Sequence, residues 1–271
     1  MPKSIVHIYD GTTLRVHETG AADGFPMVLI NGAQATSMSW PGGFLAALGG
    51  RHRIVRMDTY PAIARQSHGL RQLADDILTG LDHLGIARVH LLGFSLGGLI
   101  AQRLMLENRD RVSSVTLLCT RALGAAAMGM PEPDPRLQRL WERMAAPGDA
   151  VLDLRVEQWR LLNGSALPFA ENIYRRLERG RADTTDAHPR VAAARDLHDR
   201  TAEFRTVNTP TLIIEGGQDL LNPAPNARHL ATLIPQAQLL TIARLGHVLH
   251  PDVAPEIAAA VTTHAGSRKQ S

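Results

Sequence analysis

The sequence predicts an α/β fold in which helices cover both faces of a mostly parallel sheet. Three observations predict it: continuous apolar runs that alternate with helical periodicity, a glycine-flanked serine between one such run and a helix, and a length of 271 residues. Strands buried on both faces of a parallel sheet are expected to be continuously apolar. With 44% hydrophobic and 20% charged residues, we expect one large core that carries an insertion.

The N-terminal half supplies most of the predicted elements. Two alternating stretches, residues 4–10 and 13–19, flank the turn residues Asp10 and Gly11 and predict a hairpin. Leucines and isoleucine at helical spacing predict a helix over 70–84, which Gly85 ends. The remaining elements before residue 121 are predicted as strands at 26–32, 51–58, 89–94 and 112–120 and a helix at 96–108.

The alternation of strand and helix stops after Thr120 and resumes near residue 209. The intervening segment is rich in Arg, Leu and Ala and has a helical pattern. We therefore expect a core made of residues 1–120 and 209–271, with a helical cap at 121–208 over the carboxyl edge of the sheet, where ligands bind in open α/β sheets. Beyond the cap we expect strands in PTLIIEGGQD and AQLLTIA and helices in ARHLATLIP and VAPEIAAAVTTHA.

The segment VHLLGFSLGG places Ser95 in a G-x-S-x-G pattern between a predicted buried strand and a predicted helix. In that context the pattern indicates a tight turn that lifts a nucleophilic hydroxyl above a helix N-terminus. The alternative is a glycine-rich turn in which Ser95 only caps the helix. The strand and helix on either side favour the nucleophile.

A serine nucleophile needs a base, and the base needs an orienting acid. With this turn the expected chain order is serine, acid, histidine. His247 follows the last predicted strand, and Asp219 ends the strand and turn of LIIEGGQD. His250 and Glu215 are the competing candidates. The end of the preceding strand is the other position where such an acid can lie. No carboxylate follows that strand, which ends near Thr120, and this absence favours Asp219.

A tetrahedral intermediate also needs two backbone donors for its oxyanion. We expect one from the amide of Leu96, at the helix N-terminus. The second is expected from the loop after PMVLING, at Ala33, with Gln34 as the alternative. Gly32 would let this backbone approach closely.

Composition argues against several other classes of protein. The net charge of +3 comes from scattered arginines, without the basic and aromatic stripe that nucleic acid selects. The single cysteine, Cys119, excludes an internal disulfide and a cysteine-built zinc site. His247 and His250 lack a further ligand at metal spacing, and no dinucleotide or Walker pattern occurs. We therefore expect neither a metal nor a cofactor.

The same patterns bear on location and partners. The first 20 residues lack the apolar core of a signal peptide, and no run approaches the ~18 apolar residues of a membrane span. We expect a cytoplasmic protein whose partner is a small-molecule substrate, with no nucleic acid or membrane. A homodimer is one expected assembly.

The motifs together resemble the α/β-hydrolase fold superfamily over the whole chain. Within it, the pieces PMVLINGAQATSMSWP, WRLLNGSALPF and PAPNARHLATLIPQAQLLTIARLGHVLHP are similar to the aclacinomycin methylesterase group. These serine esterases remove a methyl ester from anthracycline polyketides. The resemblance implies an α/β-hydrolase fold, a Ser-His-Asp triad and a role in antibiotic biosynthesis or related secondary-metabolite tailoring.

One segment departs from the family pattern. Relatives carry D-x-R-G-x-G-x-S after the third strand, whereas this chain has MDTYPAIARQSHG, with Tyr60 in place of the arginine. Tyr60 is a candidate pocket hydroxyl or a packed turn residue. In the cap, Trp159 is a candidate substrate-binding residue, although burial within the cap is the alternative for its indole.

Three functions follow as hypotheses. The first is hydrolysis of a carboxylic ester on a bulky, apolar substrate, in the methylesterase-like version an aromatic polyketide, through an acyl-enzyme on Ser95. The second is a lyase or cyclase that uses the same three residues on a polyketide intermediate. The third is a ligand-binding protein without catalysis, which the filled triad positions disfavour.

Overall fold

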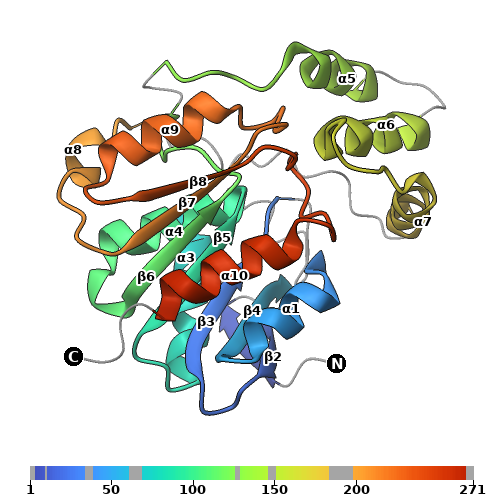
Figure 1. Ribbon diagram of the computed structural model, residues 1–271. Coiled ribbons are helices and arrows are strands. Elements are labelled where there is room, and N and C mark those ends of the chain that lie inside the picture. The colour runs from blue at the N-terminus through green and yellow to red at the C-terminus, as the bar shows by residue number, and fades with distance from the viewer. Residues whose placement is uncertain are drawn as a thin grey trace.

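A single eight-stranded sheet runs through the protein in the order β1-β2-β4-β3-β5-β6-β7-β8 (Figure 1). The computed structural model describes residues 4–9, 11–33, 39–60, 69–125, 129–145, 151–182 and 198–266. The strands are β1 (Ser4–Tyr9), β2 (Thr12–Gly20), β3 (Phe25–Ile30), β4 (His52–Tyr60), β5 (Val89–Phe94), β6 (Val112–Leu118), β7 (Thr211–Gly216) and β8 (Gln238–Ile242).

The pairing of the strands confirms the predicted architecture. Strand β2 pairs antiparallel with both β1 and β4, and the other neighbours pair in parallel. The predicted N-terminal hairpin is therefore present, with Gly11 at φ 74° in its turn. Because neighbouring parallel strands run in one direction, their carboxyl ends meet along one edge of the sheet.

Helices cover both faces of the sheet (Figure 1). On one face lie α3 (Leu70–His83), α4 (Leu96–Glu107) and α9 (Ala224–Leu233), whose buried residues share a core cluster with the sheet. On the other face lie α1 (Gly42–Gly49) and α10 (Ala254–Gly266), which complete a second cluster around Phe44, Leu48 and Ile257. The sheet is thus buried on both sides, as its continuously apolar strands predict.

The predicted insertion contains helices. These are α5 (Pro135–Ala145), α6 (Val151–Asn163), α7 (Glu171–Ala182) and the short α8 (Thr201–Phe204). Figure 1 shows α5, α6 and α7 grouped beyond the end of the sheet, with α8 next to α9 on the core. Phe204 is fully buried in the core cluster, so the last part of the segment packs against the core. The division of the chain at residues 121 and 208 stays a prediction.

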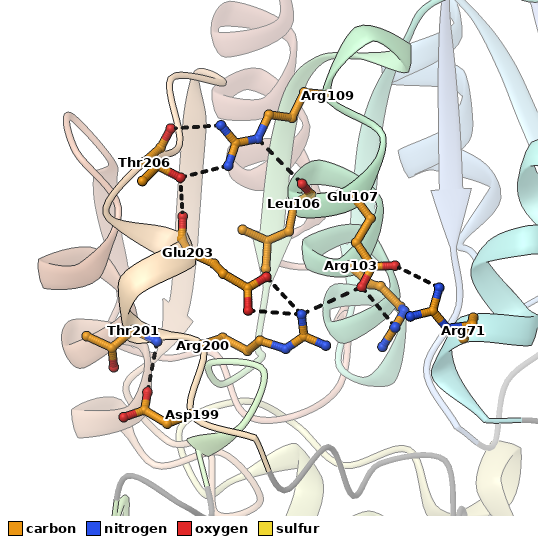
Figure 2. A network of polar contacts seen from close by, with 10 residues as sticks. All are labelled: Arg71, Arg103, Leu106, Glu107, Arg109, Asp199, Arg200, Thr201, Glu203 and Thr206. Carbon is orange, nitrogen blue, oxygen red and sulfur yellow. Dashed lines mark hydrogen bonds and ion pairs between the residues drawn. The ribbon is translucent and has the colours of Figure 1, made fainter.

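A network of arginines and glutamates fixes the segment around α8 to α4 (Figure 2). Arg200 pairs with Glu203 at 2.8 Å and with Glu107 of α4 at 3.6 Å. Arg109, in the 3-10 turn η2 (Arg109–Arg111), donates to the hydroxyl of Thr206 at 2.7 Å. The chain therefore enters β7 from an anchored position.

Two features of the helices complete the fold. Helix α1 was not predicted, because GGFLAALG begins with two glycines and buries only Phe44 and Leu48, a single pair at i, i+4. Among the described residues, no helix is long and apolar enough to cross a membrane.

Candidate active site

Ser95 occupies a strained turn between β5 and α4. Its φ of 55° and ψ of −117° lie outside the regions that a non-glycine residue ordinarily adopts. The turn is held from β6, because the Ser95 amide donates to the carbonyl of Leu118 at 3.0 Å and the Thr120 hydroxyl donates to the carbonyl of Ser95 at 2.8 Å. A Cβ at Gly97 would collide with the carbonyl of Ile30, so the motif glycines permit this tight packing.

The structure brings the three predicted polar side chains into one hydrogen-bonded chain. The Nε2 atom of His247 lies 2.8 Å from the hydroxyl oxygen of Ser95, and its Nδ1 atom lies 2.8 Å from Oδ2 of Asp219. His247 and Asp219 are both buried, at 5% and 4% exposure. The imidazole can therefore accept the serine proton while the carboxylate holds its Nδ1–H.

Asp219 is anchored by backbone donors in the loop after β7. Its Oδ1 atom accepts from the amides of Leu221 and Asn222, each at 2.8 Å, which leaves Oδ2 for the imidazole. The side chain of Asn222 donates to the carbonyl of Cys119 at 2.9 Å and ties this loop to the end of β6. The carboxylate is consequently fixed in orientation.

The competing acid and base contact other groups. Glu215 accepts from the hydroxyl of Thr241 at 2.6 Å and from the guanidinium of Arg228 at 3.2 Å. His250 lies 3.0 Å from the carbonyl of Pro168 in the inserted segment. Neither has a described contact with Ser95 or with the His247 ring.

The side chain of Cys119 is buried beside Asp219, and burial raises the pKa of its thiol well above the usual value, so it stays protonated.

The loop that carries His247 is attached to the inserted segment. The His247 amide donates to the carbonyl of Leu162 in α6 at 2.6 Å. A Cβ at Gly246 would collide with the carbonyls of Leu162 and Asn163, so only glycine permits this approach. The side-chain Nδ2 group of Asn163 donates in turn to the carbonyl of Leu167 at 3.0 Å. The base is therefore positioned by the core and by α6 together.

A small pocket of about 160 Å³ opens beside Ser95. Ala33 and Leu96, the two predicted oxyanion residues, line it together with Ser95. A Cβ at Gly32 would lie 3.1 Å from the ring of Phe94 and 3.4 Å from Cβ of Ser95, so this backbone lies close to the serine turn. Gln34, the alternative donor, lies outside the described residues. The remaining lining residues are Leu99, Thr120, Arg121, Pro133, Leu221 and Asn222.

The structure describes the side chain of only one of the two predicted substrate-binding residues. Tyr60 ends β4, but its side chain lies outside the described part of the structure, as do residues 61–68 of the divergent loop. Trp159 packs within the inserted helices, where its Nε1–H donates to Glu178 at 2.7 Å and its ring stacks on Tyr174 at 5.2 Å. Trp159 does not line the pocket beside Ser95, and its half-buried indole packs against α7 in the inserted segment.

Sequence reasoning missed the residues that support the site. Thr120 and Asn222 hold the loops around Ser95 and Asp219, and Arg121 lines the pocket. The position of Thr120 and Arg121, directly after an apolar strand at the carboxyl edge, is the signal that could have identified them. Within the described residues, no group of three or more His, Cys, Asp or Glu side chains is arranged to hold a metal ion.

The chain is similar to known proteins over nearly its whole length. The family model of the α/β-hydrolase fold matches residues 26–253. Two rhodomycin D methylesterases, DauP of a Streptomyces species and DnrP of Streptomyces peucetius, are each 32% identical over 94% of this chain and 95% of their own length. The crystal structure of a hydrolase from Pseudomonas aeruginosa superposes with a TM-score of 0.74 at 25% identity, covering 97% of this chain and 98% of that one. These similarities, together with the parallel sheet and the strained serine turn, show that the chain belongs to the α/β-hydrolase fold family.

Proposed function

We propose that this protein hydrolyses a carboxylic ester through an acyl-enzyme on Ser95. The observation that carries the proposal is the continuous chain from Ser95 through His247 to Asp219, with two contacts of 2.8 Å between buried or half-buried groups. In this proposal Ser95 is the nucleophile, His247 the general base and acid, and Asp219 the residue that holds the imidazole tautomer.

The reaction proceeds in two balanced halves. The Ser95 oxygen bonds to the ester carbonyl carbon while its proton passes to Nε2 of His247, and the amides of Leu96 and Ala33 stabilise the oxyanion. The carbon–alkoxy bond then breaks, and the imidazolium gives its proton to the departing alcohol. A water molecule, deprotonated by His247, attacks the acyl carbon and releases the acid and free Ser95.

The proposed substrate is a methyl ester of a bulky, apolar acid, such as an aromatic polyketide in secondary-metabolite tailoring. Both methylesterase relatives are named for rhodomycin D and match this chain over nearly its full length. The apolar side chains of Leu96, Leu99 and Leu221 in the pocket suit such an acid. The names of these relatives describe hydrolysis, and this favours an esterase over a lyase, a cyclase or a non-catalytic binding protein.

Methyl-ester turnover in water enriched in oxygen-18 tests the proposal. We expect equimolar methanol and acid, with one heavy oxygen in the acid, because water cleaves the acyl-enzyme. Elimination or cyclisation would leave the product unlabelled. The Ser95→Ala variant should lose turnover, whereas Ser113→Ala, a matched change at a half-buried serine of β6 outside the pocket, should keep it.

A further inference from the structure

We infer that Arg121 binds an anionic oxygen of the substrate, close to the ester that Ser95 attacks. This inference rests on the proposed ester hydrolysis and names a narrower class of substrate, an ester whose acyl part carries a carboxylate or an ionised enol or phenol. The starting observation is that Arg121 lines the same pocket as Ser95 and Leu96.

Arg121 gives this pocket a positive charge. Among the described lining residues it is the only charged one, and the others are apolar or neutral (Ala33, Ser95, Leu96, Leu99, Thr120, Pro133, Leu221 and Asn222). A neutral methyl ester has no charge that would pair with a cation at this position. Guanidinium groups bind carboxylates and similar oxyanions strongly, through directional and charge-assisted hydrogen bonds.

The guanidinium of Arg121 forms only a long ion pair with the acidic group described near it. Its Nη1 atom lies 3.8 Å from Oε2 of Glu132, which is longer than a hydrogen bond. The Glu132 side chain is 63% exposed, whereas that of Arg121 is only 23% exposed. Solvent therefore weakens this ion pair, and a substrate oxyanion in the pocket can compete for the guanidinium.

The backbone of Arg121 is fixed relative to Ser95. Gln102, which is fully buried in the helix that begins directly after Ser95, donates from its amide to the carbonyl of Arg121 at 2.9 Å. Its Oε1 atom accepts from the backbone amide of Leu123 at 2.7 Å, so the Gln102 side chain holds the backbone at both Arg121 and Leu123. On the other side, Thr120 donates to the carbonyl of Ser95. The start of the Arg121 side chain is thus held at a constant position beside the nucleophile.

The size of the pocket limits how far the anionic oxygen lies from the ester. Sites that enclose a whole drug-sized ligand have volumes of roughly 300–1,000 Å³, whereas this pocket has about 160 Å³. As bounded by the described residues, it accommodates the ester and a few neighbouring atoms, and not a whole polyketide. The oxyanion is therefore placed on the acyl part a few bonds from the ester carbon, while the apolar remainder extends out of the pocket.

Two esters that differ in one charge test the inference. Methyl hydrogen phthalate carries a carboxylate next to its methyl ester, and dimethyl phthalate replaces that carboxylate by a second, neutral ester. We expect the Arg121→Gln variant to raise KM for methyl hydrogen phthalate by about 10-fold or more, since bonds to a charged group are stronger than neutral ones. KM for dimethyl phthalate should change by less than about 2-fold, because its neutral ester oxygens form no charge-assisted bond with the guanidinium.

Matched variants separate a local effect from a general one. Arg71→Gln removes an exposed arginine of α3 and should leave both KM values unchanged. Glu132→Gln removes the competing carboxylate and should lower KM for the anionic ester. Arg121→Lys, which keeps the charge and loses the planar fork, should fall between wild type and Arg121→Gln. Equal changes for both esters in Arg121→Gln would overturn the inference and leave the ester hydrolysis intact.

A binding measurement keeps the test independent of turnover. Isothermal titration of the Ser95→Ala protein with each ester should show tighter binding of methyl hydrogen phthalate, and adding Arg121→Gln should remove the preference. If wild type hydrolyses neither ester, the proposed function fails for these compounds, yet a charge preference that depends on Arg121 still supports the anion site. Equal or undetectable binding of the two esters would contradict it.

Discussion

The backbone amide of His247 donates a hydrogen bond of 2.6 Å to the carbonyl of Leu162, a residue of α6 in the inserted segment. The proposed base is therefore oriented by Asp219 from the core and by α6 through its own backbone. Gly246 precedes this contact, at a place where any side chain would meet backbone oxygens of α6. The inserted segment thus contributes to the geometry of the proposed chemistry as well as to the pocket.

Gly246→Ala should impair turnover. The added Cβ meets the carbonyls of Leu162 and Asn163, which are backbone atoms and cannot rotate away, so the His247 loop must shift. A displacement of about 1 Å in a reacting group costs on the order of 100-fold in rate. We expect a fall in kcat of that size by steady-state kinetics. Gly43→Ala is the control, because a Cβ at Gly43 in α1 has no described atom within 4 Å; wild-type kcat in Gly246→Ala would contradict the account.

Asp219→Asn should fold normally and react poorly. The asparagine keeps one oxygen for the amides of Leu221 and Asn222, so the loop retains its anchor. Its NH2 group would face Nδ1 of His247 and favour the tautomer that protonates Nε2, which cannot accept the Ser95 proton. The same change in a serine protease lowers kcat by roughly 10⁴-fold, and we expect a loss of similar order with little change in Tm. Retained activity would mean that Asp219 does not orient the base.

Trp159→Phe should lower stability and leave substrate binding unchanged. The substitution removes the indole N–H that donates to Glu178, whose side chain is 1% exposed. Removing a donor from a buried acceptor lowers the free energy of unfolding by about 1–3 kcal/mol. Urea unfolding measures this loss, and KM for the methyl ester should move by less than about 2-fold. A severalfold rise in KM at unchanged stability would instead place the indole in the substrate site.

Stability should fall as the pH drops below about 6.5, because buried histidines must stay neutral in the folded protein. Burial lowers the pKa of His90 well below its usual value of 6.5, and the pKa of His52 and His264 is lowered by burial as well. Below pH 6.5 the unfolded chain binds protons that the folded chain does not, so each histidine favours unfolding. Above that pH both states are neutral and the contribution is constant.

Urea unfolding between pH 5 and 8 measures this dependence. Each histidine that gains a proton only on unfolding contributes a slope of ~1.4 kcal/mol per pH unit. His90→Gln should reduce the slope below pH 6.5, since His90 is fully buried on β5 between the hydroxyls of Ser114 and Thr116. His83→Gln, at an exposed position of α3, should not reduce it. A free energy of unfolding that stays flat from pH 8 to 5 would refute this prediction.

Local patterns predicted most of the fold. The apolar runs at β3, β5, β6 and β7 identify buried strands, because short, continuous apolar runs bounded by turn residues are typical of strands covered on both faces. The G-x-S-x-G turn and the order of Ser95, Asp219 and His247 predicted which side chains meet, since parallel strands deliver their following loops to one edge. Helix α1 escaped prediction because its burial depends on α10, a partner far away in the sequence.

Contacts made by backbone atoms and by the cap could not be predicted. The bond from His247 to Leu162 joins two backbone groups, whose partners are independent of residue type. The two hydrogen bonds from the Gln102 side chain to the backbone at Arg121 and Leu123 link α4 to the segment after β6, and no periodic pattern in the sequence predicts them. For Trp159, composition cannot distinguish an aromatic ring packed between helices from one that lines a pocket, whereas the structure shows its contacts with Glu178 and Tyr174.

The most direct test of the central claim is mass spectrometry of the protein, trapped by acid quench during turnover of a methyl ester and then digested. We predict that the peptide containing Ser95 gains the mass of the acyl group and that Asp219→Asn, with slower turnover, still carries this adduct only at Ser95. Ser95→Ala should show no adduct. An acyl group on another residue, or full turnover by Ser95→Ala, would contradict the account.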